Sequence, residues 1–154
     1  MNVKQQKLII EQLDKKMQLL RNIGEVPPPS NGWISATRKA LRMSLKQLGK
    51  RLGISAQSVK EIEGREITGS LTLKGLREAA QALDMRVEYV FIPQSGSLKA
   101  YIEKTAARVA TEIVMRTSQT MKLENQENSK ERIEQAIREK TEELVREMPS
   151  YIWD

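Results

Sequence analysis

The chain of 154 residues contains no cysteine and no histidine. Disulfide bonds, thiolate nucleophiles, zinc-finger ligand sets and histidine acid–base catalysis therefore have no residues to form them. The sequence also contains no long apolar run, signal peptide or lipidation motif. We expect a non-enzymatic protein that needs no cofactor or metal and that is soluble in the cytoplasm.

Aromatic residues make up only 4% of the chain, and runs of β-branched residues are scarce. The residues that dominate instead, namely Leu, Lys, Glu, Gln, Arg and Ala, favour helices intrinsically. The composition predicts a mainly α-helical fold, in which one small domain carries helical extensions.

The stretch 44–64, SLKQLGKRLGISAQSVKEIEG, has the pattern of two short helices joined by a glycine turn. Ser44 and Ser55 are placed to cap the two helices, and Gly53 tolerates the left-handed backbone that often ends a helix. Apolar residues recur at helical spacing along both segments, at Leu45, Leu48, Leu52, Val59 and Ile62. A helix-turn-helix of this kind lays its second helix in the major groove of DNA.

The positive charge of the chain coincides with this stretch. The net charge is +6, and residues 33–75 alone contain nine basic and three acidic residues, whereas the rest of the chain is balanced. A basic cluster by itself also fits a solvated surface. Its coincidence with the helix-turn-helix pattern favours binding to DNA phosphates.

The exposed side chains of the predicted helix-turn-helix are assigned to two kinds of DNA contact. Gln57 is suited to a bidentate hydrogen bond with adenine, and Ala56 and Lys60 are expected beside it at base edges. Arg65 is expected in a loop over residues 64–69 that approaches the DNA backbone. The residues expected to hold phosphates are Ser44, Lys50, Arg51, Ser55, Ser58 and Arg65.

Two further helices are expected in the same domain. One spans residues 33–43, and Ser70 is placed to cap another over 71–83. Trp33 could form a platform for a ligand, although a large aromatic at the head of a core helix more often packs inward. The first helix is expected to bury Trp33, Ile34, Ala40 and Leu41 and to expose Ser35, Arg38, Lys39 and Arg42.

The sequence changes to strict alternation at Met85. Residues 85–92, MRVEYVFI, predict one short β-strand that Pro93 ends. A single strand needs a partner, and the sequence offers no second convincing strand. Antiparallel pairing with the same strand of a second copy would give a homodimer with twofold symmetry, suited to a palindromic operator. The alternative is a segment that folds back onto its own core.

The chain divides into three expected parts. Residues 1–29 form an amphipathic helical arm and a proline-rich linker, residues 30–93 the DNA-binding domain with its strand, and residues 94–154 a helical region for dimerisation or for binding another protein. The helix of the arm, over 3–23, has an apolar stripe that must be covered by the chain, a second copy or a partner. The stripe comprises Leu8, Ile9, Leu13, Met17, Leu20 and Ile23.

The third part is predicted to contain two helices. One spans residues 98–123, and Ser129 is placed to cap another that Pro149 ends. From residue 124 to the end there are nine acidic and five basic residues. This acidic end is expected to face protein, because it would be repelled by DNA phosphates.

Residues 33–93 resemble the Xre/Cro-type repressor family in their helix order and in the pattern SxxxLxxxLGISxxSVxxIE. Members of that family commonly carry a glutamine where this chain has Leu45. The whole chain, through EQLD, GWISATRKALRMS, LTLKGLREAAQALDMRVEYVFIP, TMKLE and IWD, resembles the bacterial family called mobile mystery protein A. Members of that family are encoded beside a Fic-domain protein, so the resemblance implies an antitoxin of a Fic-domain toxin.

This resemblance draws attention to Thr120, Glu124 and Asn125. Fic proteins transfer AMP from ATP to hydroxyl groups and are silenced by a helix with Ser or Thr, three residues, Glu, then Gly or Asn. Residues four apart share a helix face, so Glu124 could reach an arginine that would otherwise hold the ATP γ-phosphate. The pattern also arises by chance in about one chain in ten of this length.

Three hypotheses follow. The first is a dimeric antitoxin that regulates its own operator, associates with the nucleoid when bound to DNA, and neutralises a Fic AMP-transferase through the TxxxEN motif. The second is a stand-alone repressor whose terminal helices only dimerise or bind an effector. The third is an adaptor whose helix-turn-helix no longer binds DNA.

Overall fold

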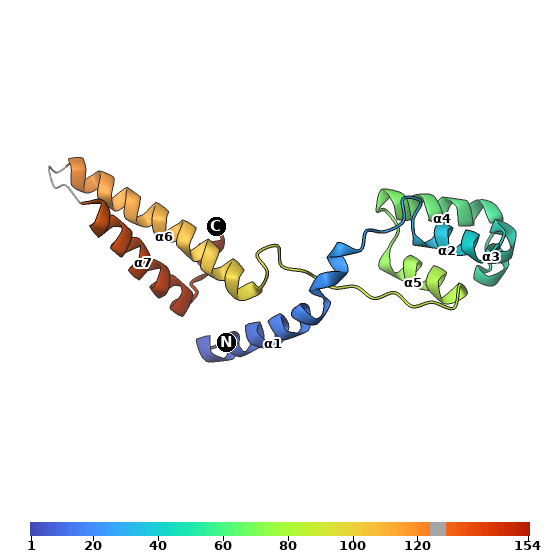
Figure 1. Ribbon diagram of the computed structural model, residues 1–154, viewed down its shortest axis with the longest axis horizontal. Coiled ribbons are helices and arrows are strands. Elements are labelled where there is room, and N and C mark those ends of the chain that lie inside the picture. Colours follow the sequence, from blue (N-terminus) through green and yellow to red (C-terminus); the bar gives the residue numbers. More distant parts are fainter. Residues whose placement is uncertain (124–128) are drawn as a thin grey trace. The chain divides into compact units, whose positions relative to one another are not determined.

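The computed structural model describes residues 1–123 and 129–154 (Figure 1). These ranges contain seven α-helices, two short 3-10 helices and no β-strand, and no helix in them is long and apolar enough to cross a membrane. The mainly helical fold class is therefore confirmed. The elements are α1 (Val3–Leu20), η1 (Arg21–Glu25), α2 (Trp33–Ala40), α3 (Leu45–Leu52), α4 (Ala56–Thr68), α5 (Leu73–Ala82), α6 (Leu98–Leu123), α7 (Lys130–Glu147) and η2 (Ser150–Trp153).

The chain forms two compact units. We call Ile23–Tyr89 the four-helix unit, and Met1–Asn22 together with Val90–Asp154 the hairpin unit. The boundary on the C-terminal side falls within the segment predicted as a strand.

Each of the four α-helices of the four-helix unit, or the residue that follows it, contributes to one apolar core. The core contains Ile34, Leu48, Val59, Ala79 and Leu83. Leu48 and Val59 are completely buried, in agreement with the helical spacing that predicted an inward face for α3 and α4.

Ile34 is buried and Lys39 and Arg42 are exposed, as predicted, but the other predicted faces of α2, including a buried Ala40, are wrong. Trp33 and Leu41 are half exposed, while Ser35 and Arg38 are buried. Arg38 can lie inside because its Nε donates to Glu63 Oε1 at 2.6 Å and its Nη2 to Glu63 Oε2 at 3.3 Å. A buried charge is tolerated when it has such a hydrogen-bonded partner.

The ends of α2 and α4 also differ from the prediction. α2 ends at Ala40, and the chain turns at Arg42, whose φ is 54°. α4 continues through Gly64 and Arg65 to Thr68, so the predicted loop over 64–69 is wrong. The added turn of α4 is held by Glu66, whose carboxylate accepts hydrogen bonds from the first backbone N–H groups of α2, including that of Ile34 at 2.8 Å.

α5 is capped two residues later than expected. Thr72, rather than Ser70, accepts a hydrogen bond from the backbone N–H of Gly75, at 3.0 Å. Ser70 N instead donates to Arg65 O at 2.9 Å, and so completes the C-terminus of α4.

Residues 85–92 form no strand in the described chain. The backbone N–H groups of residues 86–92 donate to no backbone carbonyl there, and no other segment pairs with them. The alternating pattern alone therefore does not produce a strand, because a strand requires a second one to complete its hydrogen bonds. Met85 and Val87 border a cleft of the four-helix unit together with Leu76.

In the hairpin unit, α6 and α7 lie side by side and run in opposite directions (Figure 1). Their core contains Ala106, Val109 and Ala110 of α6, Leu144 of α7 and Ile152 of η2. Ser129 caps α7 by accepting from Arg132 N at 3.2 Å, and the helix ends before Pro149, as predicted.

The helix α1 packs against the start of α6. The carboxylate of Asp14 accepts hydrogen bonds from the backbone N–H groups of Leu98 at 2.7 Å and Lys99 at 3.2 Å, and so caps α6. Residues Ile10 and Met17, on the same face as Asp14, are partly buried. Most of the predicted apolar stripe is exposed, at Leu8, Ile9, Leu13 and Leu20.

Candidate functional site

The turn between α3 and α4 is built from local hydrogen bonds that the sequence predicts. The Ser44 hydroxyl accepts from Gln47 N at 3.1 Å, while Gln47 Oε1 accepts from Ser44 N at 2.8 Å. Gly53 has a φ of 69° and ends α3, and Ser55 Oγ accepts from Ser58 N at 3.1 Å at the start of α4. Both helix starts are therefore held rigidly.

Gly49 allows this turn to fold closely against α3. A Cβ atom at this position would lie 2.6 Å from the backbone oxygen of Ile54. Because backbone atoms surround the position, a side chain there would have to displace the turn itself. The spacing between α3 and α4 thus depends on one glycine.

The residues predicted to contact bases lie at the outer face of α4. Gln57 and Lys60 are exposed and Ala56 is partly buried, whereas Val59 and Glu63 are buried on the opposite face. Ser58 is partly buried, and its hydroxyl lies 2.9 Å from that of Ser55.

An open cleft lies between the first turn of α3 and the first turn of α4. It is bordered by two lysines, three uncharged residues of the turn and its cap, and one glutamine: Lys46, Lys50, Ile54, Ser55, Ala56 and Gln47. No carboxylate borders it. The sequence prediction included Lys50 but missed Lys46 and Gln47, although Lys46 precedes Lys50 by one helical turn and so shares its face.

The acidic residues of segment 33–75 are unevenly placed. Glu63 is buried with Arg38, and Glu66 caps α2. Among the three acids of residues 33–75, only Glu61 is exposed. The exposed basic residues therefore face few carboxylates of their own segment, which favours binding of an anionic partner.

Two residues predicted to bind phosphate stand apart from this cleft. Arg51 donates to the backbone oxygen of Ala82 at 3.1 Å, and so ties α3 to the end of α5. Arg65 is exposed in the last turn of α4, about 12 Å along the helix axis from Gln57. Of the residues predicted to contact DNA, the cleft brings together Lys50, Ser55 and Ala56, and neither Arg51 nor Arg65 borders it.

The TxxxEN motif begins at the end of α6. The Thr120 hydroxyl donates to Arg116 O at 3.1 Å within the helix. Glu124 and Asn125 lie outside the described residues. No group of three or more carboxylates that could hold a metal ion occurs in the described ranges.

The chain matches no protein-family model, no curated protein and no solved structure.

Proposed function

We propose that the protein is a transcriptional regulator that binds double-stranded operator DNA through a helix-turn-helix formed by α3 and α4. The observation that carries this proposal is the cleft at the first turns of the two helices, which has two lysines and no carboxylate. Beside it, Gln57 and Lys60 extend from the outer face of α4.

In this proposal α4 enters the major groove with its first turn nearest the bases. Gln57 hydrogen-bonds an adenine, and Lys60 reaches a neighbouring base edge. Lys46 and Lys50 hold a phosphate on one side of the groove, where the capped start of α4 adds its positive helix end. A Xre/Cro-like homodimer would present two such units to a palindromic site.

The resemblance to mobile mystery protein A adds an antitoxin role to this proposal. The cognate partner would be a Fic-domain AMP-transferase, and Thr120, Glu124 and Asn125 would enter its nucleotide site. This part rests on the resemblance. The motif belongs to the hairpin unit and the candidate DNA-binding residues to the four-helix unit, so the two proposed roles do not compete for the same residues.

A selection from random DNA followed by gel-shift titration tests the DNA-binding proposal. The full chain should enrich a defined sequence. Gln57→Ala should then cost about 1 to 3 kcal/mol at one base position only. Lys50→Ala should weaken binding to all sequences alike and lower the salt slope by about one. Lys99→Ala, which removes one exposed lysine of the hairpin unit, is the matched charge control and should leave the sequence preference unchanged.

The alternative of a stand-alone repressor predicts the same DNA binding without a toxin partner. Co-purification with the product of the neighbouring gene separates the two. The antitoxin proposal expects a complex whose AMP transfer is inhibited, and expects Glu124→Gly to relieve inhibition while the complex persists. Absence of any complex would favour the repressor, and absence of DNA binding with a stable complex would favour an adaptor.

A further inference from the structure

The aromatic residues of the chain all lie outside its two apolar cores. The chain contains two tryptophans, three tyrosines and one phenylalanine. All six side chains are between 47% and 80% exposed. Since large aromatic residues usually contribute most to cores and interfaces, their placement at the surface points to an interface.

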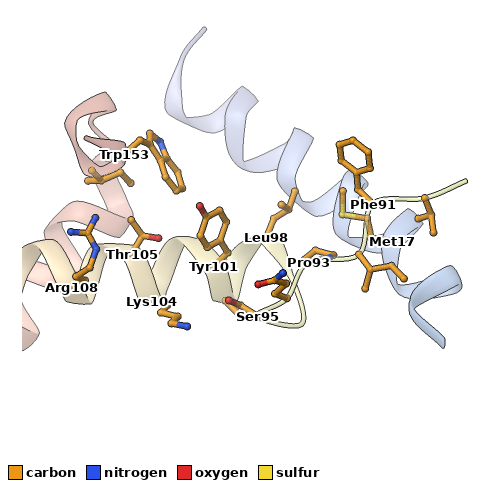
Figure 2. A pocket seen from close by; sticks show the side chains of 15 residues that line it. Met17, Phe91, Pro93, Ser95, Leu98, Tyr101, Lys104, Thr105, Arg108 and Trp153 are labelled. Atoms are coloured by element: carbon orange, nitrogen blue, oxygen red, sulfur yellow. The ribbon is translucent and has the colours of Figure 1, made fainter. Parts of the chain in front are cut away.

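Three of these residues border one open groove of the hairpin unit, with a volume of about 1320 Å³ (Figure 2). The rings of Tyr101 and Trp153 have centroids 5.3 Å apart and are tilted by 46°. Phe91 stands with Met17 at the other end of the groove (Figure 2). Phe91 is 80% exposed, so the groove that it borders does not bury its ring.

The charged residues that border the groove are both basic. Lys104 and Arg108 project from α6, and no carboxylate is among the bordering residues. Arg108 bonds Glu112 at 2.9 Å, whereas Lys104 is exposed and has no ion pair within the described chain. The groove therefore fits an aromatic side chain that has a carboxylate nearby.

The chain itself carries a segment of that chemistry. Glu88 lies three residues before Phe91, and its side chain is 71% exposed in a surface pair with Arg86. In extended conformation these three residues span about 10 Å. Phe91 itself borders the groove of the hairpin unit, so the ring and the groove are neighbours there, as a twofold interface between identical copies requires.

We propose that two copies of the chain join through this groove, with Phe91 of each copy seated in the groove of the other and Glu88 of each copy beside Lys104 of the other. This interface specifies how the homodimer of the proposed function would form. It rests on that proposed function only for its biological role. The contact would also cover the backbone N–H groups of residues 86–92, which no backbone carbonyl of the described chain accepts.

Sedimentation equilibrium of the full chain without DNA tests the interface. The wild-type chain should be dimeric, and Phe91→Ala should raise the dimer Kd about a hundredfold, because each dimer buries two such rings. Leu19→Ala is the matched control, because Leu19 is 85% exposed on α1 and does not border the groove. It should leave the dimer Kd unchanged.

Charge reversal tests the orientation of the segment. Glu88→Lys and Lys104→Glu should each weaken the dimer, and the double variant should restore it. A double variant as weak as the single variants would overturn the seating of Glu88 beside Lys104.

Fluorescence gives a second reading of the same contact. In a Trp33→Phe background, Trp153 is the remaining tryptophan, and its emission should shift to the blue as the protein dimerises. The shift should disappear with Phe91→Ala, whose circular dichroism should match the parent because Phe91 is not part of the core.

A wild-type chain that stays monomeric at all concentrations would overturn the proposal and leave the groove to a different protein. A Phe91→Ala variant that dimerises as tightly as the wild type would overturn it as well. Because dimerisation is measured without DNA, failure of DNA binding in a chain that dimerises would count against the proposed function alone.

Discussion

Removal of the Glu63 carboxylate should destabilise the four-helix unit strongly. The side chains of Arg38 and Glu63 are each only 10% exposed, and Glu63 accepts two hydrogen bonds from the guanidinium. Glu63→Ala would leave the Arg38 charge buried with a single remaining bond, to Met43 O at 2.9 Å. Breaking one side of a buried pair costs about 3 to 5 kcal/mol, a large share of the stability of a small domain.

Each unit contains one tryptophan, so the two units can be followed separately in urea unfolding. Trp33 reports on the four-helix unit in a Trp153→Phe background, and Trp153 reports on the hairpin unit in a Trp33→Phe background. Glu63→Ala should lower the unfolding free energy seen by Trp33 and leave the transition seen by Trp153 in place. Both tryptophans are about half exposed, so these background substitutions disturb no core.

Two matched variants complete this experiment. Glu78→Ala removes a surface pair with Lys74, at 4.0 Å, and should cost at most about 0.5 kcal/mol. The double variant Arg38→Met, Glu63→Leu should cost less than Glu63→Ala, because no charge remains buried. If Glu63→Ala cost no more than Glu78→Ala, the reasoning from burial would be refuted.

Four further substitutions test other parts of the structure. Gly49→Ala should destabilise the four-helix unit by about 1 to 3 kcal/mol in the same urea assay, since the added Cβ would meet the Ile54 backbone oxygen. Gly64→Ala should instead stabilise α4 by about 0.5 to 1 kcal/mol, because its added Cβ would meet nothing within 4 Å. Asp14→Ala should destabilise the hairpin unit by about 1 kcal/mol in thermal unfolding, and an unchanged midpoint would mean that Asp14 does not cap α6 in solution. Lys46→Ala should weaken binding to every DNA sequence and lower the salt slope by about one, whereas an effect confined to one base would contradict the phosphate assignment.

The starts of α3 and α4 and the turn between them follow from local sequence. Ser44 and Ser55 cap helices within three residues of themselves, and Gly53 ends α3 through its own backbone conformation. Such interactions involve neighbours in the chain, so a pattern of residues is sufficient to predict them. The outward placement of Gln57 and Lys60 follows in the same way from the inward placement of Val59, four residues after Ser55.

Contacts between distant residues decided the rest. Arg38 was expected outside because its charge favours water, but Glu63, 25 residues later, provides a buried partner. Glu66 extends α4 through bonds to α2, and Asp14 caps a helix that begins 84 residues after it. The strand predicted over 85–92 is absent from the described chain, because a strand depends on a partner and no other segment of that chain pairs with it. Local sequence thus determined the starts of α3, α4 and α7 and the turn at Gly53, whereas tertiary structure decided which charges are buried and which apolar faces stay exposed.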